Sequence, residues 1–148
     1  MRFDERLDRE LLRGVLPLCV LAVVAAHGPT YGYAITRELA DGGLGAVKGG
    51  TLYPLLQRLE DDGLVTTTWQ QGDRGPSRRY YAVTDTGREA LASAASRWDE
   101  LTSAATGIVA AGLTGRGPLD SLSDDLLPDH AGDATVSLPT SPHGRTAS

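Results

Sequence analysis

The apolar residues of this chain change their spacing twice, and these changes limit what it can fold into. From about residue 5 to residue 62 they recur at the three- and four-residue intervals of amphipathic helices. Residues 64–83 are instead rich in β-branched and aromatic side chains, which is typical of strands. Helical spacing then returns. The pattern predicts a mainly α fold with a minor β part.

Glycine and proline divide the first helical part into three segments. Helices are expected at about 5–27, 31–40 and 50–62, with a glycine-rich turn at 41–45. Gly63 is expected to end the third helix as its C′ residue. That helix places its leucines on one face: Leu52, Leu55, Leu56 and Leu59.

A hairpin and a long helix are expected next. The strands should span 64–70 and 78–83, joined by a loop at 72–76. Thr84 is a suitable N-cap for a last helix that runs from residue 85 to about residue 111.

The composition changes again after this helix. The chain has 148 residues and a formal net charge of −5. Segment 114–148 holds five acids and two bases, and 17 of its 35 residues are Gly, Pro, Ser or Thr, so it is expected to be disordered. The predicted organisation is a folded domain at 1–84, a long helix at 85–113 and an acidic tail at 114–148. The acidity of the chain is thus mostly a property of the tail.

Several function classes lack support in the sequence. Cys19 is the only cysteine and lies in an apolar run, so a buried thiol is favoured over a redox sensor. The histidines, at positions 27, 130 and 143, lack metal-ligand spacing. The apolar run at 15–26 is too short to span a bilayer, and the N-terminus does not resemble a signal peptide. We expect a cytoplasmic protein without metal, cofactor or enzymatic activity.

Two short helices around a glycine-rich turn, followed by a hairpin, predict a winged helix-turn-helix. The third helix would then be the recognition helix. Its N-terminus, at Lys48 and Gly50, suits a phosphate. Arg74, Arg78 and Arg79 would form a basic wing that reaches DNA phosphates or the minor groove. The alternative interpretation is a solvated, charged hairpin on an ordinary α+β domain.

Four motifs in order then resemble one family. They are Tyr31-Gly32-Tyr33; Thr51-Leu52-Tyr53-Pro54 with Leu56, Arg58-Leu59-Glu60 and Gly63-Leu64-Val65; Gly75-Pro76-Ser77-Arg78-Arg79-Tyr80-Tyr81; and Thr84-Asp85-Thr86-Gly87. Over about residues 10–112 the chain resembles the short form of the PadR family of bacterial transcriptional regulators.

The resemblance implies a homodimer that binds a palindromic operator in double-stranded DNA, most often as a repressor. Carried over by position, Tyr33 and Tyr53 would face the DNA backbone, and residues 48–58 would lie in or beside the groove. The DNA-binding candidates are Tyr33, Lys48, Gly50, Thr51, Tyr53, Pro54, Gln57, Arg58, Arg74, Arg78 and Arg79. The chain departs from the family at Lys48-Gly49, where relatives often have Ser-Pro. This departure leaves the operator sequence open.

The last helix is the candidate for dimerisation, because its apolar stripe is longer than one small domain can cover. Leu91, Ala94, Trp98, Leu101 and Ala105 form this candidate dimer or effector surface. Trp98 has two interpretations, an aromatic residue of the dimer core or a stacking surface for a small planar aromatic effector. Neither interpretation identifies an effector.

A second hypothesis comes from a different class of function. The winged-helix domain could serve as a protein-interaction module that does not bind an operator directly. An enzyme has no support, because no nucleophile–base pair or carboxylate pair appears in the sequence.

Overall fold

The computed structural model describes residues 2–115. Eight elements follow one another in it: α1 (Phe3–His27), β1 (Thr30–Tyr31), α2 (Gly32–Leu39), η1 (Ala40–Leu44), α3 (Gly49–Asp61), β2 (Val65–Gln70), β3 (Arg78–Val83) and α4 (Asp85–Thr114). The predicted mainly α fold, a winged helix-turn-helix with an N-terminal helix and a long C-terminal helix, is confirmed. The prediction of a disordered tail concerns residues beyond 115, which lie outside the described part of the chain.

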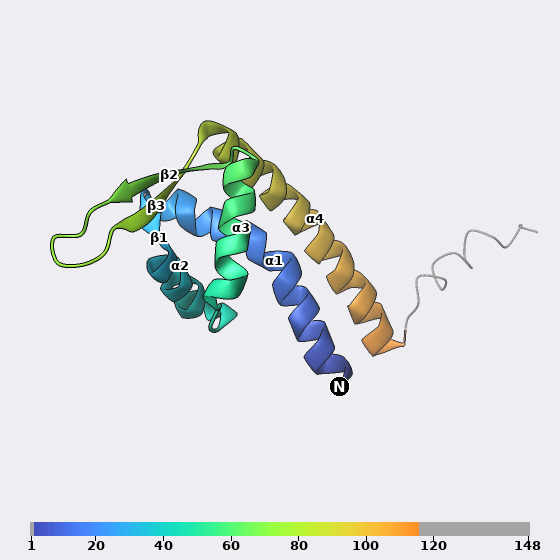
Figure 1. The fold of residues 1–148 in the computed structure, drawn as a ribbon. Helices are drawn as coiled ribbons and strands as arrows, with labels where there is room; N and C mark the ends of the chain where they lie inside the picture. The colour runs from blue at the N-terminus through green and yellow to red at the C-terminus, as the bar shows by residue number, and fades with distance from the viewer. Residues whose placement is uncertain (1, 116–148) are drawn as a thin grey trace, which may run out of the picture. The chain divides into compact units, whose positions relative to one another are not determined.

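The chain divides into two units inside α4, between Ala104 and Ala105. The first unit contains the helix-turn-helix, the sheet and the first two-thirds of α4. Helices α1, α2 and α3 lie together in this unit, and the β2–β3 hairpin extends away from them (Figure 1).

The sheet has one more strand than the sequence predicts. β1 pairs with β3, Thr30 opposite Tyr81 and Tyr31 opposite Tyr80, so that the strand order is β1-β3-β2. All pairings are antiparallel. Tyr31, which was expected to begin a helix, therefore ends a strand and serves as N-cap of α2.

The turn between α2 and α3 has a defined shape. Residues Ala40–Leu44 form a π-helical turn, which contains Gly43 with a positive φ of 102°, and Gly45, the residue that follows the turn, also has a positive φ of 76°. These values suit glycine because other residues meet a steric penalty there.

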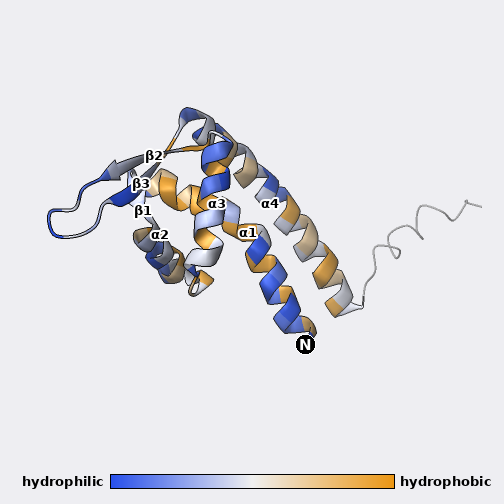
Figure 2. Ribbon diagram, viewed as in Figure 1, coloured by the Kyte–Doolittle hydropathy of each residue, from blue (hydrophilic) through white to orange (hydrophobic). Residues whose placement is uncertain are grey.

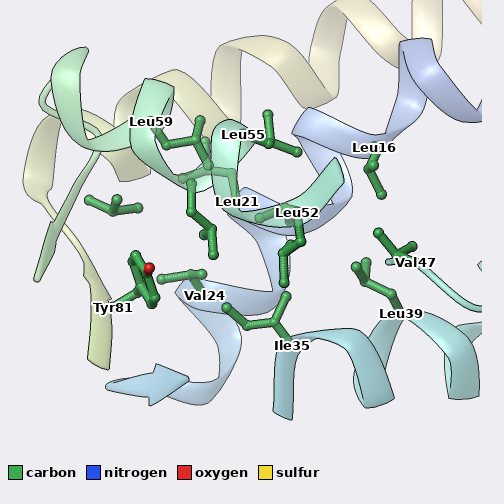
Figure 3. Close-up of a cluster of buried hydrophobic side chains, with 13 residues drawn as sticks. Leu16, Leu21, Val24, Ile35, Leu39, Val47, Leu52, Leu55, Leu59 and Tyr81 are labelled. Atoms are coloured by element: carbon green, nitrogen blue, oxygen red, sulfur yellow. The ribbon is translucent and has the colours of Figure 1, made fainter. Parts of the chain in front are cut away.

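The core holds the two helix-turn-helix helices against α1. Its members come mainly from α1 (Leu16, Leu21, Val24), α2 (Ile35, Leu39) and α3 (Leu52, Leu55, Leu59), and Tyr81 adds an aromatic ring from β3 (Figure 3). All four leucines predicted for the buried face of α3 are buried, Leu56 included. Burying each of these side chains contributes about 1.5–3 kcal/mol.

The 25-residue α1 is long and apolar enough to cross a membrane by length and composition alone. From the apolar run at 15–26 alone, this segment is predicted to be too short to span a bilayer. Four residues of the helix, however, are buried in the core: Leu16, Val20, Leu21 and Val24. This helix is therefore part of the folded domain.

Cys19 packs against the same core and is half-buried. Burial raises the pKa of its thiol above the ordinary value. This agrees with the expectation of a packed thiol rather than an activated one.

Candidate nucleic-acid interface

The outer face of α3 is polar and exposed. Thr51, Tyr53, Pro54, Gln57 and Arg58 are all exposed, as the sequence predicts. Gln57 donates a hydrogen bond from Nε2 to Asp61 Oδ1 at 2.9 Å, one turn further along the same face. The face thus presents donors and acceptors that a nucleic-acid base edge or phosphate could use.

Lys48 is the N-cap of α3, and its carbonyl accepts from the backbone N–H of Thr51 at 2.9 Å and of Leu52 at 3.0 Å. No side chain caps this helix start. The first N–H groups of a helix have no intrahelical acceptor, so those of Gly49 and Gly50 point out at an exposed, positive helix end.

Tyr53 leans from α3 over the beginning of α2. A methyl group built on Gly32 would lie 2.5 Å from Tyr53 Oη and 2.9 Å from Cε1 and Cζ. A methyl group on Gly49 would lie 3.3 Å from Tyr53 Cε2. Two glycines therefore leave the space that the phenol ring occupies, while Tyr53 as a residue stays exposed.

A groove of about 470 Å³ brings candidates from three segments together. Tyr33 of α2, Tyr53 of α3 and Arg78 of β3 all line it. The guanidinium of Arg78 lies 4.7 Å from the ring centroid of Tyr31, which restrains this long side chain by a cation–π contact. The three segments thus form one continuous surface.

Arg74 lies in the hydrophilic loop between β2 and β3, the end of the hairpin (Figure 2). Arg74 and Arg78 are exposed, and neither takes part in an ion pair within residues 2–115. They are free to meet an anion from solution.

Arg79 differs from the other two arginines of the hairpin. Its Nη2 donates to Glu60 Oε2 of α3 in a part-buried ion pair, and Thr67 Oγ1 donates to Glu60 Oε1 at 2.8 Å. Its guanidinium also lies 5.5 Å from the ring centroid of Tyr81. Arg79 thus connects β3 to Glu60 of α3, and the carboxylate of Glu60 already pairs with its charge.

Sequence reasoning missed Trp69, which lines the same groove from β2 and is 69% exposed. It lies opposite Arg79 in the register of the hairpin. The signal was a large aromatic residue on the solvent side of a strand, next to a basic loop. An aromatic residue in this position is equally typical of a strand, which is why Trp69 does not stand out in the sequence.

The side chains of the candidate dimer or effector surface on α4 become more exposed along the helix. Leu91 and Ala94 are half-buried, and Leu91 packs on the core, whereas Trp98 and Leu101 are 45% and 52% exposed. Ala105, in the second unit, is exposed. Large apolar side chains on a helix surface favour burial by a partner.

Within residues 2–115, no three His, Cys, Asp or Glu side chains group to hold a metal ion.

Comparison with known proteins agrees with this architecture. The model of the transcriptional regulator PadR-like family matches residues 20–93. The chain is 40% identical over 93 residues to the transcriptional regulator Rv3488 of Mycobacterium tuberculosis. This match covers 63% of the present chain and 84% of the relative.

Solved structures give the same result. The PadR family transcriptional regulator of Eggerthella lenta is 35% identical with a TM-score of 0.65, covering 71% of this chain and 90% of that one. A PadR-like transcriptional regulator of Bacillus cereus is 31% identical with a TM-score of 0.60, covering 68% and 96%. The family match, the shared fold and the exposed face of α3 beside the β2–β3 hairpin lead to one conclusion: this chain belongs to the PadR-like family of transcriptional regulators.

Proposed function

We propose that this regulator is a homodimeric repressor that inserts α3 into the major groove of a palindromic operator. The observation that carries the proposal is the division of α3 into two faces: four leucines are buried in the core, and the opposite face exposes polar, aromatic and basic side chains with one proline, and one carboxylate, Asp61, at the last residue of the helix. A helix with such a face fits the major groove, which is about 12 Å wide.

The proposal gives the residues of α3 separate roles. Lys48, Arg58 and the N–H groups at Gly49 and Gly50 bind phosphates, which sets the register of the helix. Tyr33 and Tyr53 face the DNA backbone from beside the groove.

Thr51, Pro54 and Gln57 lie toward the base edges in this proposal. Gln57 is the candidate for base reading, since a glutamine can pair with adenine through two hydrogen bonds. It must first release Asp61, and an exposed bond of this kind is weak.

In the wing, the proposal assigns DNA contact to Arg74 and Arg78. The prediction for Arg79 was also a DNA contact. The ion pair with Glu60 supports a positioning role instead, in which Arg79 holds the wing at a fixed angle to α3.

The dimer is proposed to form through α4. Its stripe, Leu91, Ala94, Trp98, Leu101 and Ala105, would pack against the second copy. Two-fold symmetry then spaces two recognition helices by about 34 Å, one turn of DNA. A planar aromatic effector stacked on Trp98 would release the operator if it favoured a dimer with another helix spacing. A cytoplasmic location follows from this function.

Fluorescence anisotropy with the DNA upstream of the protein's own gene tests the proposal. We expect Gln57→Ala to lose about 1–3 kcal/mol of discrimination between operator and mutated operator. Asp61→Ala is the matched control, because it frees Gln57 and removes a negative charge, so operator affinity should stay equal or rise. A protein that shows no preference for any site in this DNA, at low salt and as a pure dimer, would favour the protein-interaction module.

A further inference from the structure

A second groove lies between α1 and the first half of α3, on the first unit of the chain. Its volume is about 420 Å³, within the roughly 300–1,000 Å³ of small-molecule sites. It differs from the groove beside the wing in its chemistry, because cationic side chains and aliphatic side chains line it together.

Four cations surround this groove: Arg9 and Arg13 of α1, and Lys48 and Arg58 of α3. All four are exposed, and none takes part in an ion pair within residues 2–115. No carboxylate is among the lining residues that the structure describes. Four like charges around one groove repel one another, so an anion bound there would be favoured by all of them.

The floor of the groove is aliphatic. Leu16 and Leu55 are buried beneath it, each 4% exposed, and Leu12, Pro17 and Val47 complete it. The first half of α1 accordingly alternates hydrophilic and hydrophobic residues (Figure 2). Hydrated phosphate gains nothing from such a floor, whereas a hydrocarbon chain does.

We propose that this groove binds a single-chain carboxylate, of the size of a medium-chain fatty acid. The hydrocarbon chain lies on the aliphatic floor, and the carboxylate pairs with the arginines at the rim, which suit carboxylate through two parallel hydrogen bonds.

Binding in this groove excludes the operator. Lys48, Thr51 and Arg58 line the groove and are also proposed DNA contacts. A bound carboxylate neutralises cations that would otherwise meet phosphate. This consequence, unlike the binding itself, rests on the proposed function.

Calorimetry on the full chain without DNA tests the binding, with octanoate and decanoate below their aggregation limits as probes. Decanoate should bind more tightly, by up to about fourfold for each added methylene. Decanol, which has no charge, and inorganic phosphate, which has no chain, should each bind at least tenfold more weakly than decanoate. Absence of decanoate binding, or equal binding of phosphate, overturns the proposal.

Variants locate the site. Arg9→Ala with Arg13→Ala should weaken decanoate binding at least tenfold, whereas Arg6→Ala, an exposed arginine of α1 outside the groove, should leave it unchanged. All three positions are exposed, so the fold should survive. Equal effects of the double variant and the control contradict the assignment.

Operator binding gives the second readout. A tenfold rise in the apparent Kd for the operator is expected when decanoate reaches about nine times its own Kd. The Arg9→Ala, Arg13→Ala variant should keep operator affinity but lose this response. If the variant instead loses operator affinity and part of its salt dependence, Arg9 and Arg13 contact DNA phosphates and the proposal is overturned. Decanoate binding without any operator binding would refute the proposed function and leave the groove standing.

Discussion

Substituting Gly32 by alanine should separate DNA binding from folding. The new methyl group would lie 2.5 Å from Tyr53 Oη, while ordinary contacts begin near 3.4 Å. The ring must therefore move by about 1 Å at its hydroxyl, or rotate to another position. Since Tyr53 is 53% exposed, the ring can move toward solvent.

The two effects of this movement differ in size. Leaving its rotamer costs Tyr53 about 0.5–1.5 kcal/mol, and alanine in place of glycine returns about 0.5–1 kcal/mol. Stability should therefore change by less than about 1 kcal/mol. A hydrogen bond from Tyr53 to a phosphate is worth about 1.5–3 kcal/mol, so operator affinity should fall by roughly tenfold or more.

Thermal unfolding and anisotropy, on the same samples, measure both quantities. A double-mutant cycle with Tyr53→Ala provides the control, because residues in contact are not additive. In the Tyr53→Ala background, Gly32→Ala should have no further effect on operator affinity. An equal loss in both backgrounds, or a stability loss above about 3 kcal/mol, would refute the reasoning.

Three further predictions concern stability and reactivity. Gly87→Ala should destabilise the fold by about 3 kcal/mol or more, as measured by chemical denaturation. The new methyl group would lie 2.0 Å from the carbonyl oxygen of Leu64, a backbone atom that cannot rotate out of the way as a side chain could. A loss of stability below about 1 kcal/mol would contradict this prediction. Thr84→Ala should cost about 1–2 kcal/mol, since Oγ1 both donates to the carbonyl of Gly63 at 2.6 Å and accepts from the N–H of Gly87 at 2.9 Å, and Thr84→Ser should retain most of the stability. The thiol of Cys19, whose pKa burial raises, should react with iodoacetamide at pH 8 more slowly in the folded chain than in urea, and equal rates would contradict its packing.

The helices could be predicted because their apolar faces repeat along the sequence. The leucines of α3 needed only their spacing to be placed in the core. β1 could not be predicted, because two residues carry no period and Thr30 and Tyr31 become a strand only by pairing with β3. Propensity does not contain such tertiary pairing.

The candidate site shows the same division. Exposure of Gln57 and Arg58 follows from the burial of the leucines that flank them, Leu56 and Leu59. The pairing of Arg79 with Glu60 joins residues 19 positions apart, so the sequence cannot distinguish this arginine from its neighbour Arg78. Charge alone made the two appear equivalent.

The salt dependence of operator binding tests the central claim most directly, namely that α3 and the wing form one DNA-binding surface. The logarithm of the binding constant should fall linearly with the logarithm of salt concentration. The slope should become shallower by about 0.9 for each phosphate contact removed. We predict a shallower slope for Arg74→Ala with Arg78→Ala, and an unchanged slope for Arg88→Ala, an exposed arginine of α4. Identical slopes for all three proteins would contradict the claim.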